Sequence, residues 1–142
     1  MIEDKDIRWM QRYNSYSKAL RKLLEVVESG RAPSDLSELE KEGVVQRFEY
    51  TFELAWKTLQ DLLIYRGYEI IPGPNNVLKK SFEDGLINNH DGWRKMAKAR
   101  NITTHTYNEG DASEIVKRIY AHYAPLLKEL DTNLQNQEDF NP

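Results

Sequence analysis

Residues 45–62 read VQRFEYTFELAWKTLQDL, and this stretch decides the fold class. Its apolar side chains recur at steps of three and four residues, which is the spacing of one face of an α-helix. The stripe consists of Val45, Phe48, Phe52, Ala55, Leu59 and Leu62. The stretch therefore predicts an amphipathic helix with one buried face. We expect it to open at Ser34 or Asp35, which can cap a first turn, and to close near Arg66 and Gly67.

The same spacing extends towards the N-terminus. A first helix is predicted by the stripe of Trp9, Tyr13, Tyr16, Leu20, Leu23 and Val27. Gly30 and Pro33 then end it, because neither residue suits a helix interior. The aromatic residues Trp9, Tyr13, Phe48, Phe52 and Trp56 are assigned to the core rather than to base stacking.

Towards the C-terminus, three further helices are predicted. Residues 68–76 form a connector, followed by a short helix carrying Val77, Leu78, Phe82 and Leu86. A fourth helix starts at Asp91 or a neighbour, runs through Trp93, Met96 and Ala99 towards Tyr107, and exits over residues 108–110. The last helix is capped by Asp111 and Glu114, buries Ile115, Ile119, His122, Leu126 and Leu130, and bends at Pro125. The polar tail from Asn133 is expected to fray.

These spacings predict an all-α protein: an antiparallel up-and-down four-helix bundle with an extra short helix, in one domain over residues 1–142. The chain has no cysteine, which excludes disulfides and thiolate chemistry and suits a cytoplasmic protein. No signal peptide or membrane span is expected, since no run of about 18 uncharged apolar residues occurs. The net charge of −3 provides no global field for nucleic acid, so such contacts must be local.

Most enzyme motifs are missing from the sequence. It has no Gly-rich phosphate loop, no His-Glu-x-x-His metal motif and no Gly-x-Ser-x-Gly elbow, so we predict neither a cofactor nor a metal site. Of the three histidines, His122 is expected to be a core or interface residue and His90 a loop or cap residue. His105 is the remaining candidate for chemistry.

His105 lies in a polar run, residues 100–107, that reads RNITTHTY. In a continuous helix, turning about 100° per residue, Asn101 and His105 share one face, while Arg100 and Tyr107 are in line two turns apart. Arg100 and His105 then point about 140° apart, which is awkward for one compact site. A two-fold dimer would bring an arginine and a histidine from each chain into one cleft.

Arginine and histidine together suit phosphodiester cleavage without a metal. The forked guanidinium of Arg100 matches phosphate oxygens, and the imidazole of His105 can take up or deliver a proton near neutral pH. His105 would accept the proton of a ribose 2′-hydroxyl or protonate the leaving oxygen, while Arg100 stabilises the charge on the phosphorus oxygens. The structural alternative is that Arg100, Asn101 and His105 only cap and bridge helices.

Two stretches of the sequence carry a family resemblance. They are residues 43–57, GVVQRFEYTFELAWK, and residues 100–108, RNITTHTYN. Together they resemble the HEPN superfamily, in its branch of nucleotidyltransferase substrate-binding proteins, and the second stretch matches the signature Arg-Asn-x-x-x-His-x-Tyr. The resemblance extends over nearly the whole chain, and the two stretches together are specific, whereas the arginine-to-histidine spacing alone would be weak.

The resemblance implies a dimeric helical bundle that acts as a toxin beside a minimal nucleotidyltransferase antitoxin. Members are often metal-independent ribonucleases whose arginine and histidine, here Arg100 and His105, form the active site at the dimer interface. Asn101 would orient this pair. Tyr107 matches the tyrosine to which the partner enzyme attaches adenosine monophosphate, which silences the toxin.

Polar residues of the central helix offer a second candidate surface. The polar residues Gln46, Glu49, Glu53 and Lys57 are spaced to share a face that could look into the cleft or at a partner. A solvated, ion-paired face is the simpler interpretation, because Glu53 and Lys57 are four residues apart in the favourable order. Three hypotheses follow: a homodimeric or higher-order ribonuclease toxin, a non-catalytic subunit binding a nucleotide or substrate for a nucleotidyltransferase, and a structural bundle that stabilises its partner.

Overall fold

Helices make up all the regular structure in the part of the chain that this computed structural model describes, namely the backbone of residues 4–105 and 109–142 and the side chains of residues 8–103 and 112–142. The α-helices are α1 (Asp4–Val27), α2 (Glu38–Tyr65), α3 (Pro74–Glu83), α4 (His90–His105), α5 (Glu109–Arg118) and α6 (Ala124–Gln135). A 3₁₀ turn, Pro33–Asp35, precedes α2, and a π-helical turn, Ile119–Tyr123, joins α5 to α6. The predicted all-α class is confirmed.

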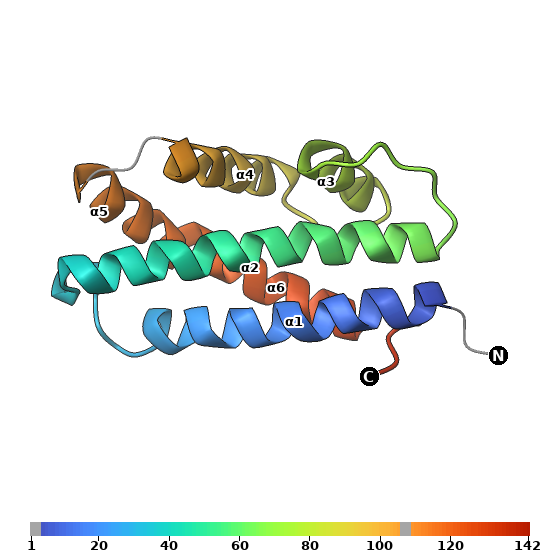
Figure 1. Cartoon of the computed structure of the whole chain (residues 1–142), viewed down its shortest axis with the longest axis horizontal. Helices are drawn as coiled ribbons and strands as arrows, with labels where there is room; N and C mark the ends of the chain where they lie inside the picture. The colour runs from blue at the N-terminus through green and yellow to red at the C-terminus, as the bar shows by residue number, and fades with distance from the viewer. Residues whose placement is uncertain (1–3, 106–108) are drawn as a thin grey trace.

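The helices make four antiparallel passes (Figure 1). α1 and α2 lie side by side, and α3 and α4 then run one after the other in the opposite direction along α2. The last pass, from α5 to α6, crosses the bundle and ends near the start of α1. The short α3 is the extra helix of the prediction, so the up-and-down bundle is confirmed. None of the described helices has the length and apolarity that a bilayer crossing requires.

The core is built from the stripes that the sequence predicts on α1 and α2. Phe48 and Phe52 are fully buried, and the Phe48 ring stacks on Tyr123 at 5.5 Å between centroids, which ties α2 to the π-helical turn. The phenol of the buried Tyr16 donates to the carbonyl of Leu127 in α6. The aromatic stripe therefore joins three passes of the bundle, as expected for core residues.

The start of α2 differs from the prediction. Ser34 and Asp35 belong to the 3₁₀ turn, and Ser37 is the residue that caps the helix. Its Oγ accepts from the backbone N–H of Glu40 at 3.1 Å, while the Glu40 carboxylate accepts from the Ser37 N–H at 2.9 Å. This reciprocal pair satisfies two amides of the first turn, and that is why the helix starts at Glu38. The end is as predicted, with Gly67 at φ +93° just after Arg66.

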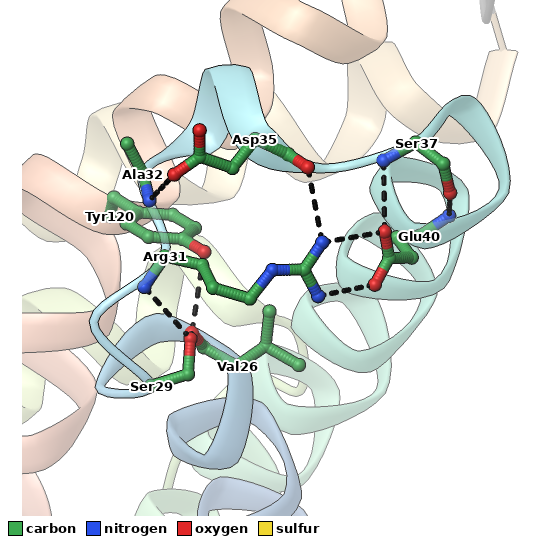
Figure 2. A network of polar contacts seen from close by, with 8 residues as sticks. All are labelled: Val26, Ser29, Arg31, Ala32, Asp35, Ser37, Glu40 and Tyr120. Carbon is green, nitrogen blue, oxygen red and sulfur yellow. Dashed lines mark hydrogen bonds and ion pairs between the residues drawn. The ribbon is translucent and has the colours of Figure 1, made fainter.

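A network around Arg31 closes the connection from α1 to α2 (Figure 2). Both terminal nitrogens of Arg31 contact the Glu40 carboxylate, at 2.5 and 2.8 Å, and one of them also donates to the Asp35 carbonyl at 3.1 Å. The hydrogen bonds between the two side chains lower the pKa of Glu40 to about 2 and raise the pKa of Arg31. Nearby, the Tyr120 hydroxyl donates to the Val26 carbonyl at 3.3 Å and brings the π-helical turn to the same corner.

The last pass departs from the predicted stripe at the π-helical turn. A π-turn holds one residue more than an α-turn, and the buried positions just after Ile119 are Tyr123 and Leu127 rather than His122 and Leu126, while Leu130 is buried as predicted. Pro125 has no N–H to donate to the preceding turn, and this favours the bulge at that point. His122 is therefore exposed, and the expectation that it lies in the core is wrong; contact with a partner stays a prediction.

Two smaller predictions at the ends of elements are also wrong. α5 begins at Glu109 rather than at Asp111, so Glu109 and Gly110 belong to a helix and not to a connection. Phe82 is 45% exposed rather than buried, because it lies over the edge of α4 and stacks on His90, the first residue of that helix, at 5.3 Å. His90, expected to be a loop or cap residue, is the first residue of α4, and the cap is Asn89 before it.

The C-terminal tail packs on the bundle instead of fraying. Asp139 binds Arg66 through two nitrogen–oxygen contacts of 2.9 and 2.7 Å, and Asp84 binds the same guanidinium at 2.7 Å. Together the two carboxylates raise the pKa of Arg66, the hydrogen bond to Asp139 having the largest effect. The Phe140 ring lies edge-on to Tyr13 at 5.1 Å. Ion pairs and aromatic packing thus order a tail whose polar local sequence predicts fraying.

Candidate functional site

Helix α4 places Arg100 at the edge of its buried face. The Asn89 side chain caps the helix by accepting from the Gly92 N–H at 2.9 Å, and the buried Trp93 and Met96 anchor its first half. Further along, Thr103 is buried and donates its hydroxyl to the Arg100 carbonyl at 2.8 Å. This bond satisfies the threonine inside the helix, which explains how a residue of modest helix propensity is accommodated there.

Arg100 forms an ion pair with α2. Its Nη2 lies 3.2 Å from Oε2 of Glu53, and both side chains are 30% exposed. The same oxygen of Glu53 accepts from the Trp56 indole N–H at 3.1 Å, and its other oxygen lies 3.3 Å from Nζ of Lys57. One carboxylate therefore holds the arginine of the predicted motif, a lysine and an indole at a single half-exposed point between two helices.

The structure joins the two sequence-predicted surfaces through this pair. Glu53 and Lys57 form the ion pair expected four residues apart, and the contact of Glu53 with Arg100 links that face to the polar motif of α4. Glu49 is half-buried on the same face, and Gln46 is exposed one turn earlier. The surface is thus neither a purely solvated face nor separate from the motif.

The other motif residues are placed as follows. Asn101 is exposed on α4, next to Arg100. The backbone of α4 remains helical as far as His105, its last residue, so the continuous helix assumed for the arginine-to-histidine spacing is present. The side chain of His105, and Tyr107 altogether, lie outside the described residues, as does the side chain of Asp111 in the predicted cap.

Trp56 is a site residue that the sequence reasoning missed. The sequence pattern predicts it in the core, but it is only partly buried and its indole N–H donates to Glu53. The signal was its position three residues after Glu53, because residues at this spacing are neighbours on a helix surface. Its Lys57 neighbour lies 5.9 Å from the centre of the same ring.

A groove of about 980 Å³ lies between α4 on one side and α5 with the π-helical turn on the other. Lys95 and Lys98 stand on its α4 wall, and Lys117, Arg118 and the exposed His122 on the other. Its lining also includes the acidic Asp91, Glu114 and Glu129 and the apolar Ile102, Ile115, Tyr123, Pro125 and Leu126. Asp91 and Glu114 pair with Lys95 and Arg118 at 3.2 and 3.6 Å, so part of this charge is neutralised within each helix.

Fold and site together define an all-α bundle that carries a polar arginine–glutamate site where its third pass meets α2. The chain belongs to the family described as nucleotidyltransferase substrate binding protein like, whose family model matches residues 11–136. The family match confirms the predicted membership of the nucleotidyltransferase substrate-binding branch.

The chain is also similar to two individual proteins. A Haemophilus influenzae protein named probable ribonuclease HepT is 28% identical over 81 residues, which are 54% of this chain and 56% of that protein. The match thus spans little more than half of that relative's length. A crystal structure of a Thermus thermophilus protein superposes with a TM-score of 0.72 at 34% identity, covering 86% of this chain and 99% of the other.

Proposed function

We propose that this chain is a HEPN-type toxin, a metal-independent endoribonuclease whose site combines Arg100 and His105 across a homodimer interface. The observation that carries the proposal is the half-exposed Arg100, held by Glu53 on a helix that continues to His105. The name of the Haemophilus relative, probable ribonuclease, points to the same chemistry.

The proposed reaction follows from the two side chains. The His105 imidazole takes the proton of a ribose 2′-hydroxyl, whose oxygen attacks the neighbouring phosphorus, and a histidine returns a proton to the leaving 5′-oxygen. Arg100 stabilises the charge that builds on the non-bridging oxygens. Asn101 orients the pair. A two-fold axis supplies one arginine and one histidine from each protomer, which removes the difficulty of their separation of about 140° along one helix.

The proposed control point is Tyr107. A minimal nucleotidyltransferase would attach adenosine monophosphate to its hydroxyl, and the bulky anionic adduct would exclude RNA and compete for the guanidinium of Arg100. The prediction is tested by coexpressing a minimal nucleotidyltransferase and measuring the mass of the peptide that contains Tyr107. One added adenylate group, absent from Tyr107→Phe, supports this control; an unmodified peptide together with silenced toxicity contradicts it.

Cleavage itself is tested with purified protein, labelled RNAs of varied sequence and excess EDTA. We expect His105→Ala and Arg100→Ala to lower the cleavage rate by roughly 10²-fold or more, since proton transfer and charge stabilisation each contribute effects of this size. His90→Ala is the matched control and should cleave at the wild-type rate. The dimer should persist in each variant by analytical ultracentrifugation. Failure of the wild-type protein to cut any RNA, or full activity of His105→Ala, overturns the proposal.

A second candidate function is supported by the groove beside α4. Its cationic rim and apolar lining suit a nucleotide or another anionic substrate presented to a nucleotidyltransferase, as the family description suggests. In that case ATP should bind the purified protein with an affinity that Lys98→Gln and Lys117→Gln reduce, while every RNA stays uncut. Equal ATP binding by wild type and both variants would remove this candidate.

A further inference from the structure

Glu53 is the acidic residue that meets the arginine of the proposed site. Its Oε2 lies 3.2 Å from Nη2 of Arg100, although the two residues are far apart in sequence. Glu53 stands on the middle of α2, where the neighbouring Phe52 and Ala55 are buried in the core and fix the backbone. The carboxylate therefore projects from a rigid element, as the support of an active-site group requires.

The carboxylate of Glu53 is itself held in place. The Trp56 indole donates to Oε2 at 3.1 Å, and Lys57 contacts Oε1 at 3.3 Å, so each oxygen has a donor from the next turn of α2. Because both donors come from the same helix, the carboxylate can be oriented before Arg100 is added. A preorganised acceptor of this kind restricts the directions in which a guanidinium can point.

We infer that Glu53 is a positioning residue for Arg100, with Trp56 as its support; this inference rests on the ribonuclease activity proposed above. Glu53 fixes one edge of the guanidinium against α2 and thereby sets the direction in which Arg100 meets the scissile phosphate. It does not touch the reacting atoms itself. Its negative charge also opposes binding of the phosphate in the ground state, so its role lies in orientation rather than in affinity.

A purely structural pair would behave differently in kinetics. If Glu53 only joined α2 to α4, its replacement would change thermal stability and leave the turnover of folded enzyme unchanged. A positioning residue instead lowers kcat, and KM stays the same or falls because a negative charge has left the neighbourhood of the substrate phosphate. The ratio of these two parameters therefore separates the two roles.

The test measures kcat and KM for RNA cleavage by Glu53→Gln, with Glu28→Gln as control. Glutamine keeps the shape and the acceptor for Trp56, and Glu28 forms another glutamate–cation pair between segments, with Lys128 at 2.6 Å. We expect kcat of Glu53→Gln to fall by about tenfold with no rise in KM, and kcat of Trp56→Phe by about threefold, because loss of orientation costs turnover. Glu28→Gln should match the wild type in both constants.

A double-variant cycle links the effect to Arg100. In an Arg100→Ala background, Glu53→Gln should not lower kcat for RNA cleavage any further. Free guanidinium should partly restore the cleavage activity of Arg100→Ala but not that of the double variant. The inference is overturned if Arg100→Ala is inactive while Glu53→Gln turns over like the wild type, or if the two losses multiply. A wild-type protein that cuts no RNA overturns the proposed function and this inference with it, so the two failures are told apart by the wild-type assay.

Discussion

Among the arginine–glutamate pairs that join α2 to other described parts of the chain, those of Arg31 and Arg100 are built differently. At the first turn of α2, Arg31 contacts both oxygens of Glu40 with both of its terminal nitrogens and also binds the Asp35 carbonyl (Figure 2). In the middle of α2, Arg100 meets Glu53 through a nitrogen–oxygen contact of 3.2 Å, on a carboxylate shared with a lysine and an indole.

Arg31 stabilises the connection that leads into α2, whereas Arg100 pairs with a glutamate of the neighbouring helix α2. The forked contact of Arg31 matches the two oxygens of the Glu40 carboxylate, which is already fixed by the cap of the same helix. The contact of Arg100 fixes one edge of the guanidinium against a carboxylate that has its own supports. An ion pair by itself therefore does not distinguish a structural arginine from a candidate catalytic one; what differs here is that the carboxylate facing Arg100 is also bound by Lys57 and Trp56.

The largest expected effect comes from exchanging arginine for lysine in both pairs. Arg100→Lys keeps the charge but loses the planar fork, so we expect RNA cleavage to fall by about 100-fold, or about 2.7 kcal/mol of transition-state stabilisation. Arg31→Lys should cleave at the wild-type rate. Initial rates on one labelled RNA compare the two variants, and equal losses in both would break the distinction between the pairs.

The sequence predicts structure well where the interacting residues are close together along the chain and poorly where they are far apart. The helices and their buried stripes follow from spacings within about two turns, as in Phe48 and Phe52, and these predictions are confirmed. The register of the last pass does not follow, because Pro125 indicates a disturbed helix without saying that one residue is added to the turn. The result is the misplaced His122.

The candidate site shows the same limit. The motif on α4 identifies Arg100, since its residues are neighbours in sequence, but its pairing with Glu53 depends on how α4 packs against α2. The ordered tail is a second example, because Asp139 looks like part of a loose end until Arg66 is brought against it by the fold. Local patterns give elements and motifs; partners across the bundle need the packed structure.

Arg66 is a third arginine, and its contacts contribute to the stability of the fold. Arg66 is committed to Asp139, Asp84 and the Gln137 side chain, and it is only 21% exposed. Arg66→Ala leaves these two carboxylates without their cation and releases the tail, so the free energy of unfolding should fall by about 2–3 kcal/mol, less than for a fully buried pair. Urea unfolding measures the loss. A variant as stable as the wild type would show that the Arg66 contacts do not stabilise the packing of the tail.

A smaller effect is expected from the cap that fixes Glu40. Ser37→Ala removes the acceptor for the Glu40 N–H, so stability should fall by about 1 kcal/mol, the usual cost of losing a serine cap. Ser34→Ala is the matched control, because Ser34 lies in the 3₁₀ turn and caps no α-helix. Equal unfolding midpoints for both variants would contradict the assignment of the helix start to Ser37, whereas RNA cleavage should be unchanged in either.

The smallest effect is a dependence on acid pH that belongs to the Arg31 pair. Arg31 lowers the pKa of Glu40 from 4.5 to about 2, so the unfolded chain binds this proton before the folded chain does as pH falls. The stabilising contribution is therefore complete above about pH 4.5 and is lost between there and about pH 2. Wild type should have a higher Tm than Glu40→Gln at about pH 6, and the difference should shrink towards zero near pH 2. Glu38→Gln, in the same turn, controls for charge at the helix start. A difference that stays constant across this acid range would mean that the forked contact with Arg31 does not determine the protonation of Glu40.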